Sequence, residues 1–133
     1  NTDFRINNEA KITSWINSFC QKEGFTIDSL VFAFFNDEDL KDLNIKFLNH
    51  DYYTDVISFD ESNKNLIKGN IAISIDRVKD NSNTFSSLFD DELKRVIIHG
   101  VLHFMGFNDK TDDEKSLIRK KEDSALEMFH VKQ

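Results

Sequence analysis

The sequence contains no proline, only four glycines and a single cysteine, Cys20. Turns must therefore be built mainly from asparagine, aspartate and serine. A lone cysteine cannot form a disulfide within the chain, and no basic-then-apolar export signal opens the sequence, so we expect a cytoplasmic protein. No stretch approaches the roughly 20 apolar residues that a membrane-spanning helix needs, and we expect no membrane partner.

Basic residues are also in the minority. The 17 Lys and Arg against 24 Asp and Glu give a net charge of −7. This balance argues against a general nucleic-acid binder, because phosphate binding usually needs a basic surface. It does not exclude an enzyme that acts on nucleic acid, since a bound divalent cation and a local basic cluster can hold a phosphate inside an acidic protein.

The composition that is present is typical of a globular protein. Hydrophobic residues make up 39% and charged residues 31% of the 133 residues, and thirteen phenylalanines supply most of the aromatic core material. This length is common for one domain, and the chain holds no repeat, low-complexity tract or linker-like segment. We therefore expect a single domain over residues 1–133.

Hydrophobic periodicity predicts alternating helices and strands. Helices are predicted over about 8–23, 37–48, 76–87, 90–105 and 111–129, the third with a flexible end. Strands are predicted over 27–35, 54–59 and 66–75, the last two joined as a hairpin by a turn of polar residues. The predicted fold class is α/β (α+β-like), a small mixed four-stranded sheet packed with helices, in which the helix at 90–105 is central and buried.

One cluster of residues points to metal chemistry. His99 and His103 are four positions apart on the predicted central helix, so their rings lie on one side of it. Gly106 can end the helix and reverse the chain, which lets Asp109 swing back toward both rings. Two histidines and an aspartate form a zincin-like tripod that leaves a position open on a divalent metal such as zinc. An open position favours hydrolysis over a purely structural role.

Two alternatives to this interpretation remain open. His99 and His103 can be ordinary core residues while Asp109 caps the last helix, or Asn108 can be the cap while Asp109 binds the metal. Zincin peptidases place a glutamate base directly after the first histidine, where this chain has Gly100. A metallopeptidase stays an alternative function, although it lacks that proton acceptor.

The motif at these residues resembles a known signature. His99-Gly100-Val101-Leu102-His103 with Gly106 is similar to the His-Gly-x-Leu-His-x-x-Gly-x-Asp-His pattern of the YbeY family of bacterial rRNA-maturation endoribonucleases. Upstream, Leu43-Asn44, Asp51 and the run Thr54 to Phe59 resemble the family's Leu-Asn…Asp-x-Pro-Thr-Asp-Val-Leu-Ser-Phe segment, and Gly69 to Ser74 resembles Gly-Asp-Ile-x-Ile-Ser. The order and spacing of all three segments agree, over about residues 43–129.

This resemblance implies a fold and a function. The expected fold is a sheet packed against helices with the metal at the base of a cleft. The expected activity is a metal-dependent endoribonuclease specific for single-stranded RNA, with one zinc ion per chain or another divalent metal in its place. The expected role is maturation of the 16S rRNA 3′ end and ribosome quality control, with the rRNA precursor and the small ribosomal subunit as partners.

The chain departs from the family pattern at four positions. Asp109 stands where the pattern has its third metal-binding histidine, Leu48 where it has an arginine, Asn70 where it has an aspartate, and Tyr53 where it has a proline. An aspartate still binds zinc, but the missing arginine removes a phosphate contact. A non-catalytic, ribosome-associated RNA-binding module is therefore a second alternative.

Further residues are candidates for roles around the metal. Asp55 is a candidate catalytic residue that orients a metal-binding histidine, or else an ordinary residue at a strand start. The candidate substrate-binding residues are Thr54, Ser58, His50 and Asn70. Tyr52 and Tyr53 are candidates for base stacking. A basic cluster either draws RNA toward the metal or forms a solvated helix face paired with Asp112, Asp113 and Glu122; it comprises Lys110, Lys115, Arg119, Lys120 and Lys121.

Overall fold

A computed structural model of the chain describes residues 4, 6 and 8–131. Its elements run in the order α1 (Glu9–Lys22), β1 (Thr26–Phe35), α2 (Asp37–Leu48), β2 (Val56–Asp60), β3 (Leu66–Ser74), α3 (Ile75–Thr84), α4 (Phe89–Phe104) and α5 (Asp112–Val131). Every helix and strand expected from the sequence is present, with bounds that differ by a few residues at most. The α/β class is confirmed.

The sheet is mixed, as expected, but smaller than expected. Its strand order is β1-β3-β2, with β3 parallel to β1 and antiparallel to β2, so the predicted hairpin of β2 and β3 is confirmed. Across the described part of the chain the sheet has three strands, and the prediction of four was wrong. The physical reason is that only three segments carry a strand pattern. Phe4 and Ile6 pack on the core without joining the sheet.

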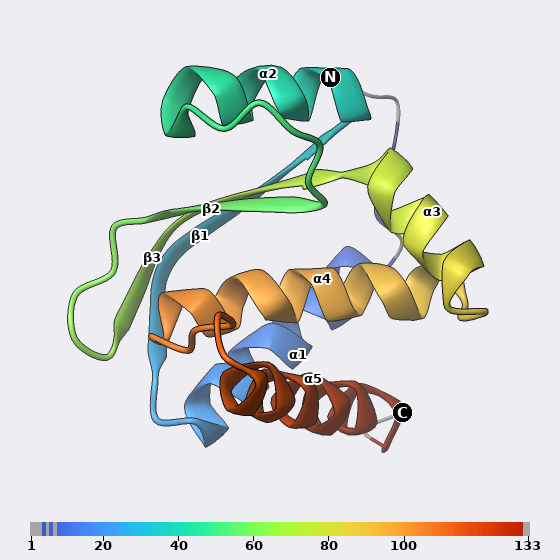
Figure 1. Cartoon of the computed structure of the whole chain (residues 1–133). Coiled ribbons are helices and arrows are strands. Elements are labelled where there is room, and N and C mark those ends of the chain that lie inside the picture. Colours follow the sequence, from blue (N-terminus) through green and yellow to red (C-terminus); the bar gives the residue numbers. More distant parts are fainter. Residues whose placement is uncertain (1–3, 5, 7, 132–133) are drawn as a thin grey trace.

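Helices cover both faces of the sheet (Figure 1). α2 lies over one face, while α4 lies along the other with α1 and α5 behind it. Side chains alternate between these faces along each strand. On β3, Ile71 and Ile73 belong to the main core, whereas Ala72 packs with Leu40 and Ile57 in the smaller core under α2. The residues of β3 on the main-core face therefore face α4, the helix that carries His99 and His103.

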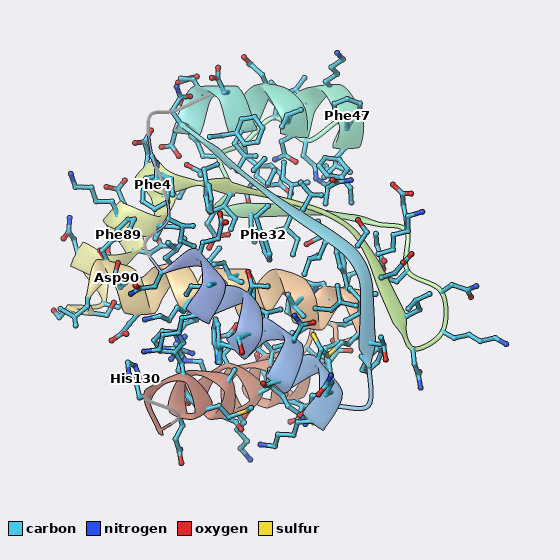
Figure 2. All side chains as sticks on the ribbon, turned by 180° about the vertical axis from the view of Figure 1, so that it is seen from behind. Phe4, Phe32, Phe47, Phe89, Asp90 and His130 are labelled. Atoms are coloured by element: carbon cyan, nitrogen blue, oxygen red, sulfur yellow. The ribbon has the colours of Figure 1, made fainter. Side chains whose placement is uncertain are left out.

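The main core lies between the sheet, α1, α4 and α5. Figure 2 shows Phe32 of β1 on the α4 side of the sheet and Phe47 on α2 beyond the other side. The central helix α4 is buried along most of its length, as its apolar pattern predicted. No helix within the described ranges is both long enough and apolar enough to cross a membrane.

The starts of α2 and α3 are tied together by a polar network. The side chain of Asn36 caps α2 by accepting from the Asp39 backbone N–H at 2.9 Å, and Ser74 caps α3. Arg77 then donates to both carboxylate oxygens of Asp37. Its Nε lies 3.2 Å from Oδ1, and its Nη2 lies 2.9 Å from Oδ2. This bidentate pair fixes α2 relative to α3 and lies apart from the histidines.

Candidate metal centre and its two clefts

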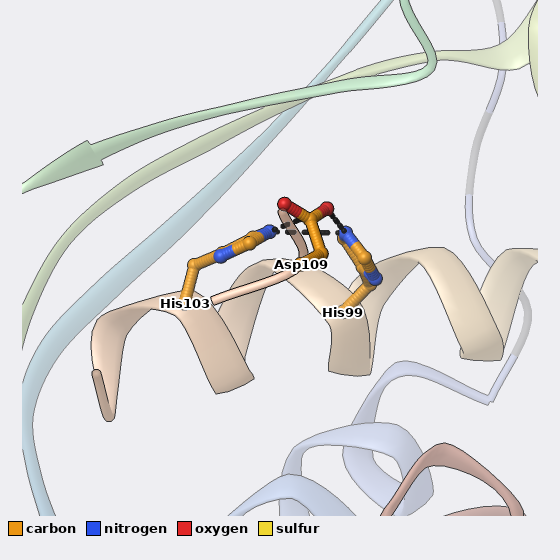
Figure 3. Close-up of side chains that lie close together, drawn as sticks. All are labelled: His99, His103 and Asp109. Carbon is orange, nitrogen blue, oxygen red and sulfur yellow. Dashed lines mark hydrogen bonds and ion pairs between the residues drawn. The ribbon is translucent and has the colours of Figure 1, made fainter. Parts of the chain in front are cut away.

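The histidines of α4 meet Asp109 at one point (Figure 3). His99 and His103 are one turn apart, and their Nε2 atoms lie 3.0 Å from each other. Asp109 Oδ2 lies 3.3 Å from Nε2 of His99 and 3.6 Å from Nε2 of His103. One ligand atom from each of the three residues falls within 4.8 Å of the others. The structure thus brings together the three residues that the sequence singled out.

A glycine turn directs Asp109 back to the rings. Gly106 has φ +98°, a conformation that a side chain disfavours. The N–H of Phe107 donates to Leu102 O at 3.1 Å and the N–H of Gly106 to His103 O at 3.0 Å, which closes the end of α4. The chain therefore reverses directly after the second histidine.

Thr111, rather than Asp109 or Asn108, caps α5. The Glu114 N–H donates to Thr111 Oγ1 at 3.1 Å, and Glu114 Oε1 accepts from the Thr111 N–H at 2.9 Å. This reciprocal arrangement is a capping box. Both hypotheses that assigned the cap to a residue before Lys110 were wrong, and the Asp109 carboxylate is left for the histidines.

The hydrogen bonds at the Nδ1 atoms of the two rings determine whether the Nε2 atoms present lone pairs. Nδ1 of His103 lies 3.0 Å from the carbonyl oxygen of Phe107, which can only accept, so this Nδ1 carries the proton. Nδ1 of His99 lies 2.8 Å from Oε2 of Glu122 and donates to that carboxylate. In neutral rings both Nε2 atoms then present lone pairs to each other and to Asp109. Three electron-pair donors at this separation repel unless a proton or a metal cation lies among them, and two imidazoles with one carboxylate suit zinc.

The support of His99 reaches across to α5. Glu122 is only 4% exposed, and its second oxygen accepts from Arg95 Nη1 at 2.9 Å. Arg95 also donates to Asp123 at 2.7 Å. Burial lowers the pKa of His99, but the hydrogen bond and charge of Glu122, with the charges of Asp55 and Asp109, outweigh burial and raise it. Glu122 therefore holds the ring in place and makes it a stronger base.

Sequence reasoning considered Glu122 only as a partner of the basic cluster on a solvated helix face, one of two alternatives, and it missed Arg95. Glu122 lies far from the motif in sequence, because it is 23 residues beyond His99 and on another helix. The one local signal was Arg95, which stands one helical turn before His99 on α4.

Two clefts open from the metal centre. The helix-side cleft has a volume of about 370 Å³ and is walled by α3, α4 and α5, with Phe85, Lys115 and Arg119 among its lining residues. The strand-side cleft has a volume of about 410 Å³ and is walled by β2, the segment before it and the end of α4. Asp55, His99 and Asp109 line both clefts. A polymer bound at the centre could extend into each.

The structure places only some of the predicted substrate residues at these clefts. Thr54 and Ser58 line the strand-side cleft. His50 lines neither cleft; its Nδ1 lies 2.9 Å from the Tyr52 hydroxyl in the loop after α2. Asn70 is in phase with Ala72 on β3, so it faces α2, on the side of the sheet opposite the histidines.

Asp55 lies at the junction of the clefts. Burial raises the pKa of its carboxyl, against the nearby charge of His99, and Asn81 donates to its Oδ2 at 3.4 Å. Glu122, not Asp55, accepts the hydrogen bond from the His99 ring, and Asp55 acts on His99 through its charge. The carboxylate of Asp55 can therefore contact a bound substrate or change the electrostatic potential at His99.

The predicted basic cluster separates into distinct environments. Lys115 and Arg119 line the helix-side cleft. Lys121 instead pairs with Glu23 at 2.7 Å. Lys110 and Lys120 are exposed and line neither cleft. Only the part of the cluster on one face of α5 therefore adjoins the metal centre.

Gly100 occupies the position where a zincin peptidase has its glutamate base. A Cβ built on Gly100 would lie 3.0 Å from Ile71 Cδ1 and 3.3 Å from Ser58 Oγ. This position faces the sheet, so the glycine allows α4 to approach β2 and β3 closely. A side chain at this position would crowd Ile71 and Ser58, and the chain has no glutamate there to serve as the peptidase base.

Comparison with known proteins identifies relatives over nearly the whole chain. The family model described as "Endoribonuclease YbeY" matches residues 1–130. Proteins named "Endoribonuclease YbeY" are similar to the chain: that of Christiangramia forsetii is 47% identical over 131 residues, covering 98% of this chain and 92% of the relative. That of Karelsulcia muelleri is 49% identical over 125 residues, covering 94% of this chain and 89% of the relative.

A solved structure shares the fold. The solution structure of TM1509 from Thermotoga maritima superimposes with a TM-score of 0.66 at 22% sequence identity, covering 94% of this chain and 85% of that one. At this identity the likeness supports the fold alone, and the family assignment comes from the sequence relatives.

Proposed function

This chain belongs to the YbeY endoribonuclease family, and from that premise we propose that it is a metal-dependent endoribonuclease that cleaves single-stranded RNA. The observation that carries the proposal is the meeting of two imidazole lone pairs and one carboxylate at the junction of two clefts. Such a donor set suits an open metal site, and the clefts give a chain-like substrate a path on either side of it.

We propose that His99, His103 and Asp109 hold one zinc ion per chain in a zincin-like site. Zinc bound there supplies Lewis-acid stabilisation of the negative charge that develops on a phosphodiester. Asp109 makes the site more anionic than three neutral histidines would, and it favours hard divalent cations as well. Glu122 and the carbonyl of Phe107 keep the two rings in one tautomer and orientation.

The residues around the centre have roles that follow from their positions. The hydroxyls of Thr54 and Ser58 can donate to phosphate or ribose oxygens of RNA in the strand-side cleft. Asp55 can accept a proton or a hydrogen bond from the ribose of a nucleotide placed between the clefts. Within the described residues strand β2 is at the edge of the sheet, with no further strand paired to its outer side, so its outer backbone groups can contact the substrate.

The biological substrate we propose is a precursor of 16S rRNA, cleaved during 3′-end maturation in the cytoplasm, with a part in ribosome quality control at the small ribosomal subunit. Family membership supports this role. The metallopeptidase alternative is disfavoured by the packing of Gly100 against the sheet. The non-catalytic alternative rests on departures from the family pattern such as Leu48 and Asn70. Neither residue lines either cleft.

The test is an RNA cleavage assay run beside a protease assay. The zinc-loaded chain should cut single-stranded RNA, lose this activity on chelation, and leave casein intact. His103→Ala should abolish cleavage, whereas His130→Ala, which removes an exposed histidine at the other end of α5, should not. RNA binding that persists without any cleavage by the zinc-loaded wild type would support the non-catalytic module instead.

A further inference from the structure

We infer that the helix-side cleft contains a nucleotide subsite, in which Phe85 stacks on an unpaired base while Lys115 and Arg119 hold the adjoining phosphate. The subsite rests on the proposed function, because it assigns one nucleotide of the RNA that the metal centre cleaves. It concerns residues that neither the metal motif nor the three matching sequence segments contain.

Phe85 is an exposed aromatic residue whose backbone is held in a closed turn. It is 63% exposed at the end of α3, and it lines the helix-side cleft. Its N–H donates to Asn81 O at 3.0 Å and the Ser87 N–H donates to Ser82 O at 2.9 Å, with Ser86 between them at φ +53°. This closed turn fixes the backbone that carries the phenyl ring at the cleft, and the ring is not packed into the core. A preorganised aromatic loses little entropy when a base stacks on it.

The cations across the cleft complete the arrangement. Lys115 and Arg119 are one turn apart on α5, and both line the same cleft as Phe85. The Arg119 side chain is 60% exposed, and its Nη1 lies 3.9 Å from Oε1 of Glu122. Among the described residues the side chain of Lys115 makes no ion pair or hydrogen bond. Both are therefore available to a phosphate, and stacking beside backbone cations is the usual way of binding single strands.

The carboxylates of the cleft define where the phosphate cannot lie. Glu92 and Glu122 are 8% and 4% exposed, so they form the floor rather than the rim, and Glu122 is already paired with Arg95. The other two carboxylates of this cleft, Asp55 and Asp109, lie at its end beside His99. An RNA phosphate is repelled from this floor and attracted to the rim cations. The volume of about 370 Å³ is near the lower end of the ~300–1,000 Å³ range of small-molecule sites, which suits a single nucleotide.

The subsite also fits the path of the chain. Because His99, Asp109 and Asp55 line both clefts, a phosphodiester at the metal centre places its two neighbouring nucleotides in different clefts. One neighbour meets the hydroxyls of the strand-side cleft, and the other meets Phe85. The bases of duplex RNA are stacked on each other and cannot stack on the ring, so the subsite favours single strands.

The experiment measures binding of a labelled single-stranded oligoadenylate by fluorescence anisotropy, on zinc-loaded and on chelator-treated full-length chain. Phe85→Ala and Phe85→Leu should each weaken binding about tenfold, and Phe85→Tyr should restore it, because stacking needs the ring. Leu88→Ala is the matched control: it removes a 71% exposed apolar side chain from the same loop but outside the cleft, and it should bind as the wild type does.

Two further readouts separate stacking and charge. Phe85→Trp places an indole at the cleft, and its fluorescence should be quenched by the oligoadenylate but not by an abasic oligonucleotide. The emission of Trp15, which is buried, should not change. Lys115→Ala should reduce the slope of log Kd against log salt by about 0.7, as expected for one lost phosphate contact on a single strand, whereas Lys120→Ala should leave the slope unchanged.

The outcomes distinguish this inference from the proposed function. If the wild type cleaves RNA but Phe85→Ala, Phe85→Leu and Leu88→Ala all bind and cleave like it, the subsite is wrong and the endoribonuclease stands. If the Phe85 variants lose binding while the zinc-loaded wild type cuts no RNA, the subsite stands and the nuclease proposal fails. Failure of the wild type to bind oligoadenylate, or equal binding of duplex and single strands, overturns the subsite.

Discussion

The two clefts that meet at His99 and Asp109 are built from different materials. The helix-side wall combines long charged side chains from α4 and α5 with apolar ones such as Phe85, and the buried Glu122 lies behind His99. The strand-side wall consists of short hydroxyl side chains and the edge strand β2, and the neighbouring ring of His103 is held by a backbone carbonyl. Changes on the first side should therefore alter electrostatics and metal affinity, and changes on the second should alter backbone spacing and stability.

The largest expected effect is on the helix side, in Glu122→Gln. An amide at this position accepts a weaker hydrogen bond from His99 Nδ1 than the carboxylate does. The change should lower zinc affinity about 10- to 100-fold, the usual effect of losing a carboxylate behind a metal-binding histidine. Zinc competition titration measures this directly. Asp123→Asn is the matched control, because Asp123 contacts Arg95 but not His99. Equal losses in both variants, or none in Glu122→Gln, would contradict the role of Glu122.

The next effect is on the strand side, in Gly69→Ala. A Cβ on Gly69 would lie 2.4 Å from Phe59 O on β2 and 2.8 Å from the Phe104 ring, so β2 must move away from β3. We expect the free energy of unfolding in urea to fall by about 1–3 kcal/mol. Lys68→Ala, an exposed neighbour, should change it by less than about 0.5 kcal/mol.

The same Gly69→Ala protein is the sharpest check on the division between the two sides. Its zinc affinity should stay near that of the wild type, because none of the three ligands lies on the sheet. A loss of zinc affinity as large as that of Glu122→Gln would show that the two walls are not separable.

The smallest effect concerns the frame that both sides share, in Asp37→Asn. Burial alone raises the pKa of Asp37, but hydrogen bonds from Arg77 and Ser74 and the Arg77 charge outweigh it and lower the pKa. The carboxylate therefore stabilises the fold above its unfolded pKa of about 3.9. The variant should lose about 1–2 kcal/mol of unfolding free energy near neutral pH.

The pH dependence gives this prediction its sign. As pH falls through the lowered pKa of folded Asp37, the wild type loses the contribution and the difference from Asp37→Asn should shrink. Urea unfolding across the acid range measures the difference, with Asp80→Asn as an exposed control that also contacts Arg77. A difference that grows on acidification, or a change in zinc affinity, would contradict the assignment of this pair to the frame.

The same contrast explains what could be foreseen from the sequence. The proposed metal triad lies on one helix and its exit loop, where the i, i+4 spacing and one glycine determine geometry locally, so the three residues could be named in advance. Thr54 and Ser58 came from a family resemblance rather than from physics. Which face of the sheet Asn70 lies on depends on the pairing register of β3. The register places Asn70 on the face opposite the histidines, and the residues next to it in sequence do not reveal this.

Other features depend on how distant elements pack, and periodicity does not encode this. Glu122 reaches His99 only because α5 lies beside α4, and its pattern on α5 alone indicated a solvated charge. The fourth strand was expected from the general architecture, although the chain offers three strand patterns. Phe85 belonged to a polar segment with weak periodicity, and its exposure became visible only when the turn between α3 and α4 was placed.

The most direct measurement of the central claim is the zinc content of the purified chain after equilibrium dialysis, beside the His99→Ala/His103→Ala double variant. We predict about one zinc per wild-type chain and none bound stoichiometrically by the variant, since both imidazole donors are gone. A wild type without zinc, or a variant that retains it, would contradict the conclusion that these side chains converge to hold a single metal ion.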